Sequence, residues 1–379
     1  MLLNGLNKGS IEDLEATDRY LSELKDLVQL HARAQGIPDK RCAQILDLIQ
    51  CDGGAKDDAW VRVWSRAAFE CETSGDDLGA CRYYNLARFP YVDGPDRATA
   101  LAKCVAAFER WAASRKIQRM EIGVGDSRVR AWVKTGVPKS KRLLLVLGGI
   151  VSIKEQWGEL LNNADRLGMT VAITEMPGVG ENTVPYDRTS WEMLPRLLDE
   201  LGESSGVQCT YMTAMSFGGH LAMRAALHDM RISGIVTVGA PISDFFTRAD
   251  LWPSLPETTI RTLAHIANVE RENLQRHVAS FALTDDELSR LKIPVYYVAS
   301  LRDEIIPRSE SLRLSSHVAQ ARVVEFDDVH GAPRHLTEYK IGIVRALLNM
   351  QGRARARRTA LGAVQMLFAA RRRLAALVA

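Results

Sequence analysis

One serine stands where a strand-like pattern gives way to a helical pattern. The stretch AMSFGG at 214–219 follows the β-rich run CTYMT and precedes the helical run HLAMRAALHDM. A serine on such a sharp strand-to-helix turn has a strained backbone that exposes its hydroxyl, and the turn needs small neighbours. The helix that follows places its positive N-terminal end beside the hydroxyl, where it stabilises a developing oxyanion. The pattern therefore predicts that Ser216 is the nucleophile of an acyl-transfer reaction.

A serine hydroxyl is a poor nucleophile at neutral pH, so it needs a base, and the base needs a group that orients it. His330 follows the strand-like run ARVVEF, and Asp303 follows the run PVYYVAS. Both fall at the carboxyl ends of expected parallel strands, where ligand-facing loops lie. We therefore predict His330 as the base and Asp303 as the orienting acid. His335 and Asp244 remain as alternatives for these two roles.

Acyl chemistry also requires backbone N–H donors for the oxyanion. The residue after the nucleophile, Phe217, supplies one donor, and the loop after the run RLLLVL is expected to supply the other. Within that loop we predict Ile150, although the glycines at 148–149 would serve an ordinary turn equally well. No HExxH motif, paired cysteines or carboxylate cluster indicates a metal, and PGVG at 177–180 lacks the GxGxxG spacing. We predict neither a metal nor another cofactor.

These residues need a scaffold of strands and helices that brings them together. From about residue 117, short β-rich runs alternate with helical segments, which predicts a mostly parallel sheet with helices on both faces. The runs are IQRMEIGV, RVRAWVKT, RLLLVLGG, TVAITEMPG, CTYMTAMS, GIVTVGAP, PVYYVAS and ARVVEF. Helical segments are expected near 153–167, 187–203, 217–230, 309–319 and 333–350. A short turn, GVGDS, joins the first two runs, so we expect an antiparallel hairpin at one edge of this eight-stranded sheet.

The chain divides into three parts by pattern. Residues 1–115 have apolar residues at helical spacing and no strand pattern, which predicts a helical N-terminal domain. Residues 116–350 form the expected α/β core. About 50 residues separate GIVTVGAP from PVYYVAS, and such a long connection usually has a function, so we expect the insertion at 244–291 to contribute to a lid. Residues 351–379 are an arginine-rich tail, expected to be a solvated segment, a basic helix or a dimer contact.

Composition excludes several classes of protein. The chain has 379 residues, a hydrophobic content of 46% and a net charge of +3, and no run reaches the roughly 18 apolar residues of a membrane-spanning helix. The seven arginines of the tail account for the positive sign, because the rest of the chain is mildly acidic. We therefore expect no nucleic-acid partner and no membrane partner. The N-terminal residues lack a signal-peptide pattern, and the six cysteines show no CxxC pair, which favours the cytoplasm.

Several motifs resemble a branch of the α/β-hydrolase family. This branch contains the 2,6-dihydropseudooxynicotine hydrolases, the fungal polyketide-shortening hydrolases and the esterase-like fermentation/respiration switch proteins. The similar motifs are LGGIVSIKEQW, EMPGVGEN, AMSFGGH, LRDEIIP and DDVHG, within about 140–350. Two positions depart from the usual pattern, since Ala214 replaces a glycine of the turn and Met176 stands where relatives often have Asp.

The resemblance implies the α/β-hydrolase fold, with the N-terminal helices as a cap over the active site. It also implies Ser216, Asp303 and His330 as the catalytic triad, and a homodimer. The expected reaction is hydrolysis of a C–C bond next to a ketone, or of an ester or thioester, in a bulky, polyketide-like or aromatic small molecule. Acyl transfer to another acceptor would use the same residues. A binding or regulatory protein that kept the fold without turnover is the remaining alternative.

Overall fold

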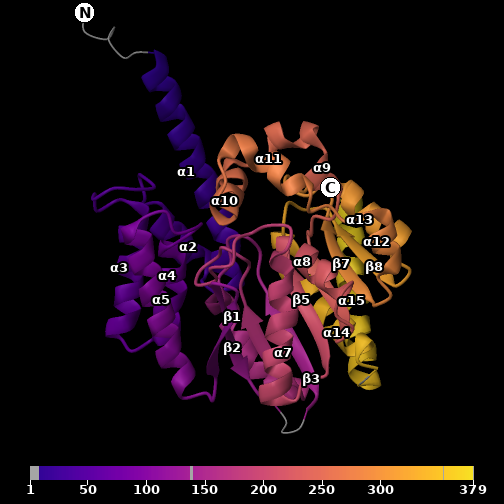
Figure 1. Cartoon of the computed structure of the whole chain (residues 1–379). Helices are drawn as coiled ribbons and strands as arrows, with labels where there is room; N and C mark the ends of the chain where they lie inside the picture. Colours follow the sequence, from indigo (N-terminus) through magenta and orange to yellow (C-terminus); the bar gives the residue numbers. More distant parts are fainter. Residues whose placement is uncertain (1–7, 137–139, 353, 379) are drawn as a thin grey trace, which may run out of the picture.

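The chain folds around one eight-stranded sheet (Figure 1). The structure, a computed structural model, describes residues 8–136, 140–352 and 354–378, and for residues 8–16 and 371–378 it describes the backbone only. The strands are β1 (Gln118–Val124), β2 (Ser127–Lys134), β3 (Arg142–Leu147), β4 (Thr170–Thr174), β5 (Cys209–Met215), β6 (Ile232–Val238), β7 (Val295–Ser300) and β8 (Ala321–Phe326). Each overlaps one of the eight β-rich runs of the sequence, although β2 begins one residue and β6 two residues before its run.

The strand order is β1-β2-β4-β3-β5-β6-β7-β8. The pairs from β4 to β8 are all parallel, whereas β2 is antiparallel to both β1 and β4. The expected edge hairpin is therefore present. Every residue of β4 and β7 is buried, as expected for parallel strands with helices over both faces. The carboxyl ends of β3, β5, β6, β7 and β8 consequently meet at one edge of the sheet.

Five helices precede the sheet: α1 (Lys8–Ala34), α2 (Asp39–Leu46), α3 (Trp60–Thr73), α4 (Asp77–Ala87) and α5 (Pro95–Ala113). Figure 1 shows α3, α4 and α5 packed side by side at the β1–β2 end of the molecule. Large aromatic side chains fill the space between them. Trp60 stacks on Phe89, Trp64 stacks on Tyr83, and the two tryptophan rings contact each other at a tilt. Burial of such rings is a dominant source of stability in a small helical unit.

The helices of the core lie between the strands or after the last strand in sequence. They are α6 (Ala164–Leu167), α7 (Met193–Ser205), α8 (Phe217–Ala226), α13 (Arg308–His317) and α14 (Leu336–Met350), with 3₁₀ segments η1 (Lys154–Asn163), η2 (Ser190–Glu192) and η4 (Pro333–His335). The stretch near 153–167 is thus mostly 3₁₀ rather than α-helical. At Gly158 a Cβ atom would lie 2.1 Å from the Phe108 ring, so this segment runs closely against α5.

The connection between β6 and β7 holds α9 (Asp244–Thr247), η3 (Ala249–Ser254), α10 (Glu257–Ala267), α11 (Arg271–Ala279) and α12 (Asp285–Arg290). Its helix α10 lies beside α1 above the sheet (Figure 1). Glu23 of α1 joins them, because its Oε2 accepts hydrogen bonds from the backbone N–H and the hydroxyl of Thr258, at 3.1 and 3.3 Å. The two segments, far apart in sequence, therefore form one cover over the carboxyl edge of the sheet.

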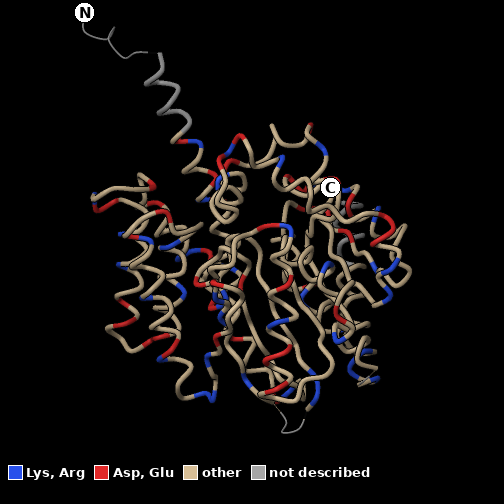
Figure 2. Tube along the Cα trace, viewed as in Figure 1, with Lys and Arg blue, Asp and Glu red and all other residues tan. Residues whose placement is uncertain are grey.

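The arginine-rich tail forms a helix, α15 (Arg355–Val378), that packs along α14. Arg345 of α14 donates to Gln365 Oε1 at 2.8 Å, and Gly362 is buried in the contact. Within the described part of the chain, no helix combines the length and the apolar character needed to cross a membrane. Figure 2 shows acidic and basic residues interspersed over the molecule, so the charged side chains do not gather into a single block.

Candidate active site

Ser216 is the single residue between β5 and α8. Its φ of 50° and ψ of −127° lie in a region that residues with a side chain rarely adopt, and such strain is typical of functional sites. The turn is held by the Ser216 N–H, which donates to Val238 O at 2.8 Å, and by the Gly219 N–H, which donates to Ser216 O at 2.8 Å. The strained conformation therefore presents the hydroxyl above the edge of the sheet.

Close packing explains why the turn needs small residues. A Cβ atom on Gly218 would lie 2.5 Å from Gly148 O, and one on Gly219 would lie 2.1 Å from Thr237 Oγ1. Ala214 is fully buried within β5, between its neighbours in β3 and β6. The methyl group of Ala214 is accommodated in the strand, so the departure from glycine at this position leaves the turn intact.

Three side chains that are distant in sequence form a hydrogen-bonded chain. Ser216 Oγ lies 3.1 Å from His330 Nε2, and His330 Nδ1 lies 2.9 Å from each carboxylate oxygen of Asp303. Asp303 Oδ1 also accepts hydrogen bonds from the backbone N–H groups of Ile305 and Ile306, at 3.0 and 2.8 Å. The carboxylate is thus fixed in place and favours the tautomer with a proton on Nδ1, which leaves Nε2 free to accept the serine proton.

The surroundings of His330 adjust its basicity. Burial lowers the pKa of His330, but the charge of Asp303, the hydrogen bond to it and the charge of Glu304 outweigh burial, so the pKa is raised above the ordinary value. The backbone N–H of His330 donates to Glu304 Oε2 at 3.0 Å. Gly239, with φ of +59°, passes beneath the pair, where a Cβ atom would lie 2.9 Å from His330 Cε1. The imidazole therefore contacts the backbone at a position where a residue with a side chain would clash.

The alternative base and acid lie elsewhere. His335 stacks on Phe326, with ring centroids 4.7 Å apart, and its Nδ1 is 3.8 Å from a carboxylate oxygen of Glu338. Asp244 begins α9 and accepts a hydrogen bond from Arg313 at 3.2 Å. The structure thus brings His330 and Asp303 to Ser216, and neither alternative joins this group.

The two backbone groups expected to bind an oxyanion lie beside the hydroxyl. Phe217 begins α8, where the N–H groups of the first turn have no partner within the helix. Ile150 lies in the loop after β3, and a Cβ atom on the preceding Gly149 would be 3.2 Å from Ser216 Cβ. Both Ile150 and Phe217 line the same cavity as Ser216. The loop after β3 therefore approaches the serine as closely as glycine allows.

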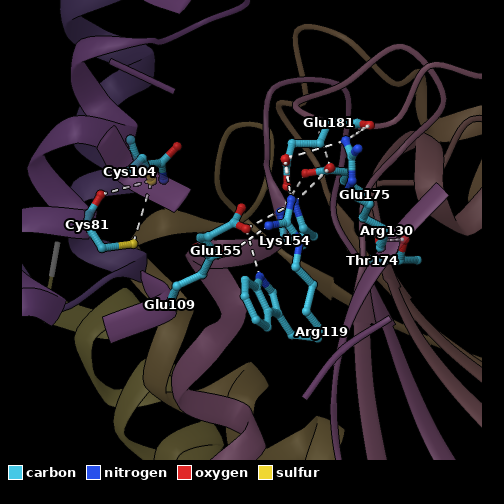
Figure 3. Close-up of polar contacts among 12 residues, drawn as sticks. Cys81, Cys104, Glu109, Arg119, Arg130, Lys154, Glu155, Thr174, Glu175 and Glu181 are labelled. Carbon is cyan, nitrogen blue, oxygen red and sulfur yellow. Dashed lines mark hydrogen bonds and ion pairs between the residues drawn. The ribbon is translucent and has the colours of Figure 1, made fainter. Parts of the chain in front are cut away.

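A buried ion cluster holds the far end of this loop (Figure 3). Lys154, with a fully buried side chain, lies 3.0 Å from Glu155, 3.1 Å from Glu175 and 2.8 Å from Glu181. The Lys154 N–H also donates to Glu175 Oε2 at 3.1 Å. Burial raises the pKa of Glu175 to about 6, although the charge of Lys154 acts in the opposite direction. The cluster ties the loop after β3 to the loop after β4.

A second buried cation holds the middle of the loop. Arg88 of the N-terminal helices donates to Val151 O at 2.6 Å, to Asn85 Oδ1 at 2.7 and 2.9 Å, and to Pro90 O at 3.0 Å. Its side chain is almost fully buried, and burial lowers its pKa to about 10, so it remains charged at neutral pH. The loop is therefore fixed partly by the core and partly by the N-terminal helices.

A cavity of about 100 Å³ opens above Ser216 and His330. Leu27 and Leu30 of α1 and Thr258 of α10 line it, and they also line an outer cavity of about 450 Å³ that leads to the surface. Among the described residues around the inner cavity, none is Lys, Arg, Asp or Glu. No group of three or more His, Cys, Asp or Glu in the described ranges could hold a metal ion. The site therefore offers a neutral, mostly apolar chamber beneath helices α1 and α10.

Comparison with known proteins identifies the family. Over 92% of its length the chain matches 99% of the solved structure of wild-type AbyA5, with 40% identity and a TM-score of 0.87. Residues 142–267 also match the family model of the alpha/beta hydrolase fold. The chain belongs to the α/β-hydrolase family. The crystal structure of 2,6-dihydroxy-pseudo-oxynicotine hydrolase has the same fold, at 20% identity and a TM-score of 0.66. The match covers 80% of the present chain and 90% of the chain in that crystal structure.

Curated relatives of this α/β hydrolase are named as enzymes. It is 24% identical to the 2,6-dihydropseudooxynicotine hydrolase of Paenarthrobacter nicotinovorans, over 68% of this chain and 75% of that protein. It is 21% identical to esterase FrsA of Vibrio cholerae, over 72% of each protein. Both matches extend beyond the residues of the family model, so the likeness includes part of the helical regions.

Several residues of the cavity in this hydrolase were not predicted from the sequence. Leu27, His31 and Ala34 of α1 line it, as do Gln156 and Trp157 of η1. Leu27 and His31 are four residues apart, and His31 and Ala34 are three residues apart. This spacing places the three side chains on one face of a helix. This spacing was visible in the sequence, but nothing in it indicated that the face would cover a distant serine.

Proposed function

We propose that this α/β hydrolase is a serine hydrolase that works through a covalent acyl-enzyme. It cleaves a C–C bond next to a ketone, or an ester or thioester bond, in a bulky, polyketide-like or aromatic small molecule. The observation that carries the proposal is the hydrogen-bonded chain from Ser216 through His330 to Asp303 at the floor of a cavity. Relatives named as a hydrolase and as esterases support the same class of reaction.

In the proposed reaction, Ser216 Oγ attacks the carbonyl carbon while its proton passes to His330 Nε2. The N–H groups of Phe217 and Ile150 bind the oxyanion of the tetrahedral intermediate. Asp303 stabilises the imidazolium without taking its proton. His330 then gives the proton to the leaving alkoxide, or to the carbon of a leaving enolate, or to a thiolate. Water, deprotonated by the same imidazole, finally releases the acid from Ser216.

The inner cavity supports a neutral, largely apolar substrate. The side chains around the inner cavity are mostly apolar, and the inner and outer cavities together fall within the usual size range of small-molecule sites. A narrow chamber beneath α1 and α10 also argues against a polymer. The motifs similar to those of polyketide-shortening hydrolases support the polyketide-like class, and the relative named as a 2,6-dihydropseudooxynicotine hydrolase supports hydrolysis.

Labelling with a fluorophosphonate probe tests the proposal, because such probes react only with an activated serine. We expect covalent labelling of the intact protein and complete loss of labelling in Ser216→Ala. Ser243→Ala, which changes a mostly buried serine before α9, is the matched control and should keep full labelling. A folded protein that does not react would favour a binding or regulatory role. Product analysis with added alcohols and amines separates hydrolysis from acyl transfer.

A homodimer and a cytoplasmic location belong to the same proposal. Met366 and Leu367 of α15 are each about 70% exposed, and adjacent exposed apolar side chains of this kind favour contact with a second copy. Sedimentation velocity measures the oligomeric state, and a monomer at micromolar concentration would contradict the proposed homodimer.

The proposed cytoplasmic location is supported by the six cysteines, which are free thiols, as expected in a reducing compartment.

A further inference from the structure

One wall of the cavity carries a histidine that the proposed reaction does not use. His31 of α1 and Gln156 of η1 both line the chamber above Ser216. Their side chains meet across the junction between the N-terminal helices and the core, with His31 Nδ1 3.2 Å from Gln156 Oε1. Each residue is less than 10% exposed. This pair places hydrogen-bonding groups in a wall that is otherwise mostly apolar, and a buried polar atom normally has at least one hydrogen-bond partner.

The hydrogen bond fixes the role of each ring nitrogen of His31. An amide oxygen only accepts, so Nδ1 carries the proton and Nε2 has a lone pair. Burial, with smaller effects from the charges of Arg88 and His330, lowers the pKa of His31 to about 4. The ring is therefore neutral at physiological pH. Nε2 has no hydrogen-bond partner within the described part of the chain, and His31 borders the cavity, so Nε2 offers an acceptor to whatever occupies it.

A chain of buried hydrogen bonds holds the backbone of α1 at His31. Gln35 Nε2 donates to the backbone oxygen of His31 at 3.1 Å, and Asn85 donates to Gln35 Oε1 at 2.9 Å. Asn85 in turn accepts from the buried guanidinium of Arg88. His31 also packs on the Phe89 ring, with centroids 5.1 Å apart. A side chain fixed by packing and by a supporting hydrogen-bond network is prepared to bind a ligand in one geometry.

The wall of the cavity also contains a potential donor. Trp157 follows Gln156 in η1 and lines the same cavity, and its indole Nε1–H is buried without a hydrogen-bond partner. A Cβ atom on Gly148 would lie 3.0 Å from this nitrogen, so the indole N–H lies beside the loop that approaches Ser216. An unpaired buried donor destabilises the protein unless a ligand or water satisfies it. The wall therefore contains one acceptor and one unsatisfied, buried donor.

We propose that His31 and Trp157 form a recognition subsite for a neutral substrate that carries a hydroxyl group, including an enol, beside an oxygen acceptor. The substrate hydroxyl donates to His31 Nε2, and a carbonyl or ether oxygen accepts from Trp157 Nε1. The absence of Lys, Arg, Asp and Glu from the described lining of the inner cavity favours a neutral occupant over an ionised one. This inference rests on the proposed function, because the substrate must reach Ser216.

Matched substrate pairs test the subsite. 4-Nitrophenyl butanoate and hexanoate are compared with their 3-hydroxy and 6-hydroxy derivatives, and phenyl acetate is compared with hydroxyphenyl acetates, so that each half of the substrate presents a hydroxyl. In the intact protein, at least one hydroxylated compound should exceed its parent in kcat/KM by about tenfold, the effect of one good hydrogen bond in a dry site. In His31→Phe, which keeps the ring packing on Phe89, this preference should fall to about one.

His277→Phe is the matched control. His277 also packs on a phenylalanine ring and donates one hydrogen bond, to Tyr186 O, but it lies outside the cavity. This variant should keep the full preference for the hydroxylated compound. Trp157→Phe removes the indole donor, so it should lower kcat/KM for the hydroxylated compound. It also provides a second variant in case His31→Phe does not fold.

The outcomes separate the subsite from the proposed function. If fluorophosphonate does not label Ser216 in the folded protein, the proposed function itself fails. If Ser216 is labelled but the intact protein prefers no hydroxylated compound, the subsite alone is overturned. The same holds if the preference survives unchanged in both His31→Phe and Trp157→Phe. Loss of the preference with normal labelling of Ser216 in His31→Phe supports the subsite, because a purely structural defect would reduce the rates on both members of a pair.

Discussion

At the scale of single residues, Asp303 has two functions that its two carboxylate oxygens make compatible. Oδ1 accepts from the backbone N–H groups of Ile305 and Ile306, and both oxygens lie 2.9 Å from His330 Nδ1. The backbone bonds fix the carboxylate, and the carboxylate fixes the imidazole. This orientation is needed for proton transfer from Ser216, because the wrong tautomer would put a proton on Nε2.

Asp303→Asn should reduce kcat by about 10³ to 10⁴-fold with little change in the fold, because an amide favours the wrong tautomer of His330 and cannot stabilise the imidazolium. Steady-state hydrolysis of a 4-nitrophenyl ester measures this. Asp327→Asn is the control, since Asp327 is exposed and pairs with Arg302 beside the site. If Asp303→Asn lowered kcat no more than Asp327→Asn does, Asp303 would have no role in catalysis.

The pH dependence of activity should reflect the raised pKa of His330. The base must be neutral to accept a proton, so kcat/KM should fall as pH decreases through this pKa, at a pH above the ordinary value for histidine. Glu304→Gln removes a negative charge near the ring but keeps an acceptor for the His330 N–H. This variant should move the acidic limb of the pH profile to lower pH. A profile that stays in place would show that Glu304 does not affect the base.

At the scale of elements, the loop between β3 and η1 is held by two buried cations from opposite sides. Arg88 reaches Val151 O from the N-terminal helices, and Lys154 joins three glutamates of the core. The expected oxyanion donor, Ile150, directly precedes Val151, the residue whose carbonyl Arg88 binds. Such anchoring places a backbone N–H with the precision that oxyanion binding requires, so the N-terminal helices contribute to the site as well as covering it.

Lys154→Met should lower the free energy of unfolding by about 3 to 5 kcal/mol, because three carboxylates would remain in the cluster without their common cation. Thermal or urea unfolding measures the change, and kcat should fall as the loop loosens. Lys292→Met, which changes an exposed lysine, should alter stability by no more than about 0.5 kcal/mol. Equal effects of the two substitutions would contradict the anchoring role of the cluster.

At the scale of the whole molecule, the arginine-rich tail packs along α14, and none of its described residues lines the cavity above Ser216. Ser216, Asp303 and His330 follow the carboxyl ends of β5, β7 and β8. Helix α15 packs on α14 near the beginning of β7, where Gln365 and Val295 line one groove. The charges interspersed over the molecule in Figure 2 are consistent with a tail that acts through packing on α14.

Deletion of residues 351–379 should therefore leave kcat/KM within about twofold while it lowers the melting temperature by several degrees, because it uncovers one side of α14. Differential scanning fluorimetry and an esterase assay measure the two effects. Sedimentation velocity on the same variant tests the proposed dimer, which should dissociate if α15 forms the contact. Loss of activity in a folded, truncated protein would show instead that the tail acts on the site.

The sequence determined the strands and the positions from which chemistry could arise. Runs such as LLLVL and VYYVAS have too little polar character to face water, so each had to become a buried strand, and the residues after them had to lie at its carboxyl end. This is why Ser216, Asp303 and His330 were predicted from local pattern and chain order. The tertiary structure alone decided which helix face would cover them.

The roles of Arg88, His31 and Trp157 depend on contacts between segments more than 60 residues apart in the chain, such as Arg88 with Val151 and His31 with Gln156. In the sequence, a buried arginine and a histidine on an apolar helix face look like ordinary packing residues. Local propensity acts over a few residues, whereas the relative position of α1, η1 and β5 follows from how their side chains pack together. These residues line the cavity only because of that packing, and their local sequence did not indicate that they would.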